Sequence, residues 1–128
     1  MRALQHWQAR SPRQREGAAA EDAACDLLEQ SGLCVVERNV RFRAGEIDIV
    51  AREGDVLVFV EVRSRRSLDE AAWSLTGAKQ GRMRRAAQLY LLRRHGHGWP
   101  ACRFDAVLVA GRQLRWMRDA FVFEEESA

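Results

Sequence analysis

Apolar residues recur at helical spacing in two long segments of this 128-residue chain. The first segment covers about residues 16–30, and Gly32 stands where a helix would stop. The second follows Thr76, a residue suited to capping a helix, and runs to about His95. The apolar positions are Ala20, Ala23, Ala24, Leu27 and Leu28 in the first segment, and Met83, Ala86, Ala87, Tyr90 and Leu91 in the second. This spacing predicts two helices that each bury one side.

Short apolar runs between and after these helices predict strands. The strands are expected over residues 33–42, 45–50, 58–63 and 103–109, with a short fifth over 113–117. Residues 64–75 are expected to form a loop. Three consecutive strands followed by a helical crossover are typical of an α/β fold with a mixed sheet of four to five strands. The expected order is αβββαβ, with helices on both faces of the sheet.

The second and third strands form a predicted hairpin, and each carries an acid where an apolar residue is expected. A two-residue loop between them pairs either Arg52 with Asp55 or Glu53 with Val56. The first register leaves the two acids diagonal to each other, and the second places them directly opposite. In both, side-chain alternation puts Asp48, Glu61 and Arg63 on one face, and Ile47, Ile49, Val60 and Val62 on the other.

Two carboxylates in so apolar a hairpin need a partner, a proton or a metal. Oxygen ligands suit a hard ion such as Mg²⁺ or Mn²⁺, and the carbonyl of Val62 is a further possible ligand. Metal-dependent phosphodiester hydrolysis uses such a site. Alternatively, Asp48 is simply solvated and Glu61 pairs with Arg63 or Arg41. A third strand acid, Asp105, is expected to pair with Arg103 or a backbone amide.

The length of 128 residues favours one domain, expected over residues 14–122, between a flexible basic arm (1–13) and an acidic tail (123–128). No run has the length of a membrane span, and no signal peptide is evident, so we expect a cytoplasmic location. The three cysteines, Cys25, Cys34 and Cys102, have no metal-type spacing and are expected to be buried thiols.

The net charge is only +3, but the basic residues are segregated. Residues 79–94 contain six basic residues and no acid, a pattern that indicates nucleic acid as a partner or else merely a soluble helix face. Lys79 is the only lysine beside 20 arginines. With Gln80, it falls in the first turn of the second helix, where the helix dipole favours an anion. The candidate nucleic-acid-binding residues are Arg41, Arg43, Arg65, Arg66, Lys79, Gln80, Arg82, Arg84 and Arg85.

Several linked motifs resemble the small bacterial YraN family. They are Glu37-Arg38-Asn39, Gly45-Glu46-Ile47-Asp48, Val58 to Arg65, Lys79-Gln80 and Arg103-Phe104-Asp105. That family is similar to the PD-(D/E)xK nucleases, which have the restriction-endonuclease-like fold and include Holliday junction resolvases. The resemblance implies that Asp48 and Glu61 are the catalytic acids and that Arg63 stands at the usual lysine position. It also implies that Glu21, which lies at the edge of the buried side of the first helix, completes the metal site. Alternatively, Glu21 near the helix start merely interacts favourably with the helix dipole.

Arginine stays protonated at physiological pH, so Arg63 cannot act as a general base. It could instead hold water or stabilise a phosphate electrostatically. Three hypotheses therefore stand: a metal-dependent DNA endonuclease for branched or structured DNA, a catalytically inactive nucleic-acid-binding module of the same fold, and an interaction scaffold with structural acids. The resemblance also permits a homodimer.

Overall fold

The computed structural model describes residues 12–96 and 98–122. The elements are α2 (Pro12–Gln30), β1 (Cys34–Phe42), β2 (Gly45–Glu53), β3 (Val56–Ser64), α3 (Leu68–Trp73), α4 (Gly77–His95), β4 (Cys102–Ala110) and β5 (Gln113–Phe121). The strands form one sheet in the order β1-β2-β3-β4-β5. Only β3 and β4 are parallel neighbours, so the sheet is mixed, and α3 and α4 make the crossover between them. The predicted α/β class is confirmed.

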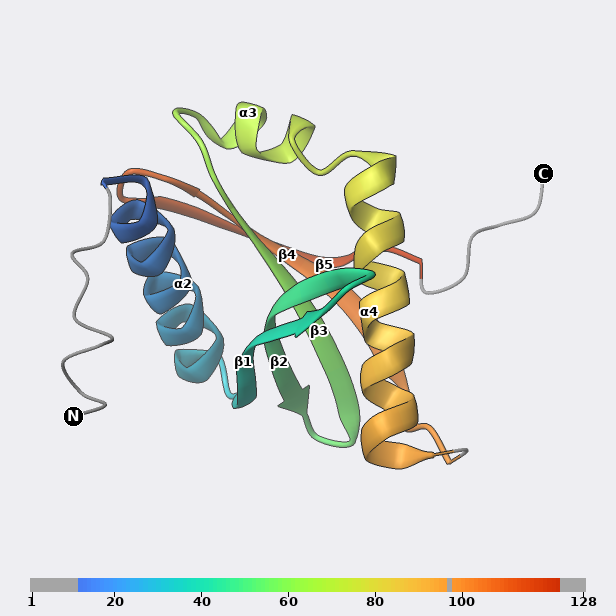
Figure 1. Ribbon diagram of the computed structural model, residues 1–128. Coiled ribbons are helices and arrows are strands. Elements are labelled where there is room, and N and C mark those ends of the chain that lie inside the picture. The colour runs from blue at the N-terminus through green and yellow to red at the C-terminus, as the bar shows by residue number, and fades with distance from the viewer. Residues whose placement is uncertain (1–11, 97, 123–128) are drawn as a thin grey trace, which may run out of the picture.

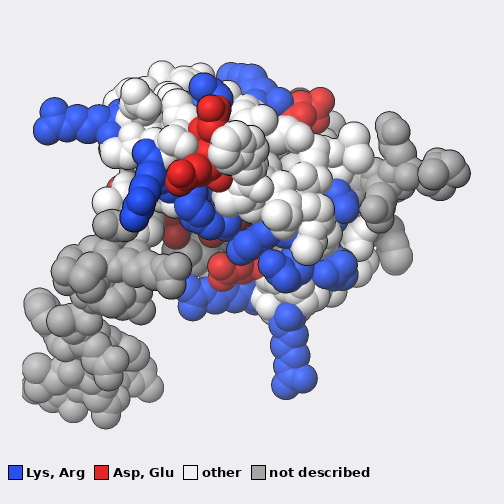
Figure 2. All heavy atoms as spheres, turned by 90° about the horizontal axis from the view of Figure 1, so that it is seen from above, with Lys and Arg blue, Asp and Glu red and all other residues white. Residues whose placement is uncertain are grey.

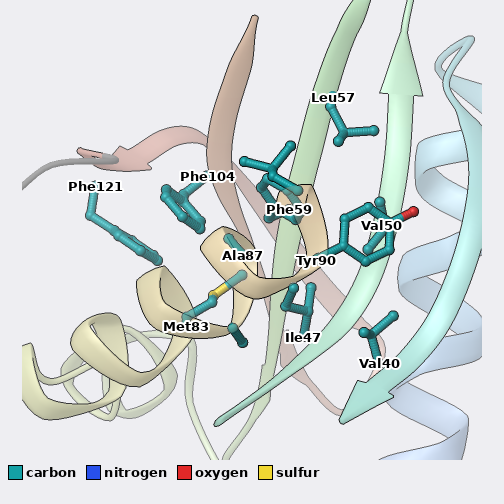
Figure 3. Close-up of a cluster of buried hydrophobic side chains, with 12 residues drawn as sticks. Val40, Ile47, Val50, Leu57, Phe59, Met83, Ala87, Tyr90, Phe104 and Phe121 are labelled. Atoms are coloured by element: carbon teal, nitrogen blue, oxygen red, sulfur yellow. The ribbon is translucent and has the colours of Figure 1, made fainter. Parts of the chain in front are cut away.

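Helices cover both faces of the sheet, which gives three layers (Figure 1). On one face, α4 buries Met83 against Phe59 and Phe104 of the central strands (Figure 3). On the other face, α2 buries Leu28 in a cluster that includes Val60. Strand residues alternate between these two clusters, so both faces of the central strands are apolar and dry, as expected for a sheet covered on both sides.

Most predicted elements are confirmed, but the predicted loop over residues 64–75 is wrong. Within it, α3 is a six-residue helix capped by Ser67, whose side chain accepts a hydrogen bond from the backbone N–H of Glu70. The helix buries Ala71 against Ala106 and Leu108 of β4. Its cap and this small apolar contact stabilise a helix too short to produce a periodic pattern. The fifth strand is also longer than expected and reaches Phe121.

The ends of the chain lie mostly outside the described residues. The predicted basic arm falls on residues 1–11 apart from its last two positions, which already belong to α2. The predicted acidic tail, residues 123–128, is entirely outside.

The cysteine expectation is only partly met. Cys25 is buried, Cys102 is half-buried, and Cys34 is exposed, because it begins the edge strand β1. All three are free thiols. None of the described helices combines the length and apolar character that a bilayer crossing requires.

The β2–β3 hairpin takes the second of the two predicted registers. Its loop is Gly54–Asp55, because Glu53 pairs with Val56. From this turn the ladder runs only as far as the pair of Ile49 and Val60. Beyond that pair, β2 leaves β3 while it stays paired with β1.

The prediction that Ile47 and Ile49 share a face is wrong. Ile49 packs in the α2 cluster, whereas Ile47 packs in the α4 cluster (Figure 3). Between them lies Asp48, and the facing β1 residue, Asn39, has a φ of 54°, in the left-handed region that asparagine tolerates. Because β2 is no longer tied to β3 at this point, the strand rotates about its own axis and Ile47 changes sides.

Gly45, at the start of β2, lies directly against α4. A Cβ atom at this position would overlap the backbone carbonyl oxygen of Arg82. Backbone atoms cannot move aside as the end of a side chain can, so glycine is required here.

Gly45→Ala is expected to lower the free energy of unfolding by about 1–3 kcal/mol, the usual cost of overpacking, as measured by urea denaturation. Gly77→Ala is the matched control, since an added methyl group there has nothing within 4 Å. A Gly45→Ala protein as stable as the Gly77→Ala protein would contradict the close packing of β2 on α4.

Candidate functional site

Asp48 lies where β2 separates from β3. Its Oδ2 atom accepts a 2.8 Å hydrogen bond from the backbone N–H of Val62. This bond takes the place of a ladder bond, because the β2–β3 pairing has already ended at Ile49 and Val60. The C=O of a strand residue points to the same side as its N–H, so the Val62 carbonyl also faces the gap between the strands. Asp48 is thus held close to the plane of the sheet, within reach of both faces.

A cleft of about 850 Å³ lies beside Asp48, between the start of α2 and the end of β3. Asp48, Val62 and Glu21 line it, together with Arg65 and Arg66 of the segment after β3. Figure 2 views this end of the molecule and shows acidic side chains among basic ones, some of them set below the surface. Three of the four predicted metal ligands therefore meet at one cleft.

Glu61 and Arg63 belong to the other side of the sheet, toward α3 and α4. Arg63 Nη1 lies 3.2 Å from Glu61 Oε1, and each side chain is only 11% exposed. Arg63 Nε also donates a 2.8 Å hydrogen bond to Oγ of Ser74, which follows α3. Asp48 turns into the gap and lines the cleft, yet its carboxyl group stays within hydrogen-bonding reach of Glu61, so the expectation that Asp48 shares a face with Glu61 and Arg63 is met only in part. The pairing of Glu61 with Arg63, one of the two alternatives, is present.

Glu21 faces the cleft from α2, as predicted. Its side chain is 19% exposed, and its Oε1 lies 3.6 Å from Nη2 of Arg38, beyond hydrogen-bonding distance. That oxygen is buried and accepts no hydrogen bond. The same guanidinium nitrogen makes its shorter contact, 2.9 Å, with Asp22. The Glu21 oxygen therefore retains the capacity to bind a further ligand.

The buried acids affect one another. Burial raises the pKa of Asp48 to about 8, and the negative charge of Glu61 adds to this, while the hydrogen bond from Val62 opposes it. Burial also raises the pKa of Glu61, against the lowering effects of Arg63 and Lys79. A pair of nearby carboxylates titrates as a unit and holds a proton more tightly than either acid alone. Burial and mutual repulsion therefore favour a proton at this acid pair, which a bound cation would displace.

Asp105 shows how a strand acid is satisfied elsewhere in the same sheet. It is fully buried. Its Oδ1 accepts hydrogen bonds from Nε of Arg103 (3.0 Å) and the backbone N–H of Asp119 (2.9 Å). Its Oδ2 accepts from Nη2 of Arg103 (3.2 Å) and Nε1 of Trp116 (2.9 Å). The predicted pairing with Arg103 and a backbone amide is confirmed, so Asp105 is a structural acid, in contrast to Asp48.

No three His, Cys, Asp or Glu side chains among residues 12–96 and 98–122 are grouped so that they could hold a metal ion. The predicted ligands are divided, because Glu61 is held by Arg63 while Glu21, Asp48 and Val62 face the cleft. The donor atoms nevertheless fit a hard divalent ion, since all are oxygens and one buried Glu21 oxygen lacks a hydrogen bond. For the four residues to act together, Glu61 must either give up Arg63 or bind the ion through Oε2 while Oε1 keeps its contact with Arg63.

The predicted nucleic-acid-binding residues lie in three places. Arg65 and Arg66 are at the cleft, Lys79, Gln80, Arg82, Arg84 and Arg85 are on α4, and Arg41 and Arg43 are at the β1–β2 turn. The turn and α4 are adjacent, because Gly45 packs on α4. Three of these side chains are already engaged. The Gln80 amide donates to the Leu75 carbonyl at 3.1 Å, Arg65 Nη1 donates to the Ser64 carbonyl at 2.7 Å, and Arg41 lies 3.4 Å from Glu46.

Two residues of the site were not singled out from the sequence. Ser74 anchors Arg63 but lies in a segment expected to be a loop, so nothing pointed to it. Arg38 contacts Glu21 across 17 positions of the chain. Arg38 belongs to the Glu37-Arg38-Asn39 motif, and its place in this family-like motif is the signal by which the sequence could have identified it.

Comparison with known proteins gives a consistent family assignment. The family model described as the uncharacterised protein family UPF0102 matches residues 20–109. A UPF0102 protein of Dechloromonas aromatica is 51% identical over 107 residues, covering 82% of this chain and 87% of the relative. One of Nitrosomonas europaea is 47% identical over 111 residues, covering 83% and 92%. The YraN-like family resemblance is confirmed, and the matched segment contains Glu21, Asp48, Glu61 and Arg63.

The raised pKa of Asp48 predicts a distinctive dependence of stability on pH. The folded protein holds a proton that an unfolded Asp48, with an ordinary pKa of 3.8, releases. The free energy of unfolding should therefore fall as pH rises from about 4 to about 8, by up to about 1.4 kcal/mol per pH unit. Urea denaturation between pH 5 and 8 should show a shallower slope for Asp48→Asn, which cannot ionise.

Asp55→Asn is the matched control, because Asp55 is exposed in the hairpin turn. It should keep the wild-type slope. A slope that is the same in wild type and Asp48→Asn would show that Asp48 is not the group that takes up the proton.

Proposed function

This chain belongs to the uncharacterised protein family UPF0102, and we propose that it acts as a metal-dependent endonuclease on branched or otherwise structured DNA. The single observation that supports this most is the position of Asp48, turned into the gap between β2 and β3 with a pKa raised to about 8. The buried strand acid Asp105 is paired with an arginine, whereas Asp48 accepts a backbone N–H and lies beside a second carboxylate, an arrangement that would suit a cation. We further propose that the fold is of the restriction-endonuclease-like type.

A bound Mg²⁺ or Mn²⁺ would orient water and offset negative charge on the phosphate. Asp48, Glu61 and the Val62 carbonyl would hold the ion, and Glu21 would contribute from α2. Arg65 and Arg66 line the same cleft and would hold the phosphate backbone. Arg63, released from Glu61, would stabilise charge on the phosphate, because arginine cannot remove a proton from water.

Cleavage is tested with flapped, branched and single-stranded DNA in the presence of Mg²⁺ or Mn²⁺. Wild type should cut at least one of these DNAs, and Asp48→Ala should reduce the rate at least about 100-fold, since it removes a charge-bearing ligand. Glu46→Gln is the matched control, because Glu46 is an exposed acid two residues away on the same strand. It should cut at the wild-type rate.

Calorimetric titration with Mn²⁺ separates the metal site from the reaction. Binding by wild type and Glu46→Gln, lost in Asp48→Ala, supports the site even if no DNA is cut. Cleavage that survives in Asp48→Ala, or the absence of both cleavage and Mn²⁺ binding in wild type, would remove the endonuclease proposal.

A second candidate, a nucleic-acid-binding module without catalysis, is favoured by the contacts of Arg63. This guanidinium bonds both Glu61 and Ser74 and is 11% exposed, so it is firmly placed against the acid that a metal would need. If these contacts persist with DNA bound, Arg63 would not reach the phosphate, and the protein would bind without cutting.

Binding through α4 is tested with Arg85→Glu, which reverses an exposed charge on that helix. The affinity for duplex DNA should fall, and the slope of log K against log salt should decrease by about one. Arg52→Glu, also exposed but on β2, is the matched control. Equal losses in both variants would mean that only net charge matters and that α4 is not the interface.

A further inference from the structure

Trp73 is 73% exposed, the highest value among the large apolar side chains of the described residues. It is the last residue of α3, which buries Ala71 toward β4 and leaves Trp73 on the outer side. Indole is a large, rigid and mostly apolar surface that makes no contribution to the core from this position. Its exposure suggests that it contacts a ligand.

Trp73 is directly connected to the candidate site. Its neighbour Ser74 accepts the hydrogen bond from Arg63, and Arg63 in turn contacts Glu61. Ser74 Oγ also donates a 2.6 Å bond to the carbonyl of Ala71, so the residue is fixed at the end of the helix. A ligand on Trp73 therefore lies on the same end of the molecule as the acid pair.

The charges around α3 indicate what kind of ligand group fits Trp73. Exposed Arg65 and Arg66 precede the helix, and Lys79 follows it at the start of α4. The first turn of α3, by contrast, carries exposed acids at Asp69 and Glu70. A polyanion would run along the basic residues and present an uncharged part to the helix. In a nucleic acid, that part is a base.

We propose that Trp73 stacks against one unpaired base of a DNA strand whose phosphates pass the cleft. A base inside a duplex already stacks on both neighbours, so its face is available only in a single-stranded or frayed segment. The inference rests on the proposed nucleic-acid function and narrows its substrate to DNA that has a single-stranded segment beside the cleavage site.

The test is equilibrium binding, by fluorescence anisotropy, of a labelled single strand, a blunt duplex and a duplex with a single-stranded flap. EDTA is present, so that the result is independent of catalysis. Trp73→Ala should weaken binding to the single strand and the flap by roughly 5- to 100-fold, the value of one stacked base. It should leave the blunt duplex unchanged, and Trp73→Phe should retain part of the affinity.

Trp99→Ala is the matched control, because Trp99 is also exposed, at 42%, but lies beyond the far end of α4, where its Nε1 donates to the Gly96 carbonyl. It should bind all three DNAs like wild type. Unchanged single-strand binding by Trp73→Ala, or an equal loss for the blunt duplex, overturns the stacking site and points to a protein contact or a backbone contact instead. If either result is found while wild type binds DNA in EDTA and cuts it with Mg²⁺ or Mn²⁺, only the stacking site fails. If wild type binds none of the three DNAs, both proposals fail.

Discussion

The hydrogen bond from the Val62 amide to Asp48 is the interaction on which the site depends. A sheet normally satisfies each backbone amide with the next strand, and a buried amide without a partner costs free energy. Here the Asp48 side chain accepts that bond, so β2 can separate from β3 without leaving the Val62 amide unpaired. The separation gives the sheet an opening between two covered faces. The cleft, the coupled acids and the approach of β2 to α4 all lie at this opening.

A strand aspartate that accepts a hydrogen bond from a backbone N–H of a neighbouring strand occurs twice in the sheet, with opposite consequences. Asp105 also accepts a backbone amide from a neighbouring strand, at a register shift opposite Asp119, whose φ is 53°. There, Arg103 and Trp116 complete the shell of donors and fix β5 on β4. Asp48 accepts one backbone N–H, from Val62, and its other partner is the carboxyl group of Glu61 instead of a cation. One acid is therefore structural, and the other retains unsatisfied capacity.

Much of the fold was predictable because its signals are local. Helical spacing identified α2 and α4, and the turn residues limited the hairpin to two registers, one of which the structure adopts. The face of the sheet on which Ile47 packs was not predictable. Side-chain alternation assumes an unbroken β2–β3 ladder, and the ladder ends where the Asp48 side chain accepts the Val62 N–H. The contact of Arg63 with Ser74 was likewise hidden, since it requires α3, whose six residues show no period.

Arg63 determines how the acid pair behaves in the absence of a ligand. A proton and a fixed guanidinium together neutralise the site, so an incoming cation competes with both of them. Competition with the proton makes cation affinity rise with pH, because the ligands must be ionised to bind. Competition with Arg63 requires a movement, since Ser74 and Glu61 hold the guanidinium from two sides. Any ligand that shifts α3 would change the contact between Ser74 and Arg63. The exposed end of α3 is thereby coupled, through Arg63, to Glu61 and Asp48.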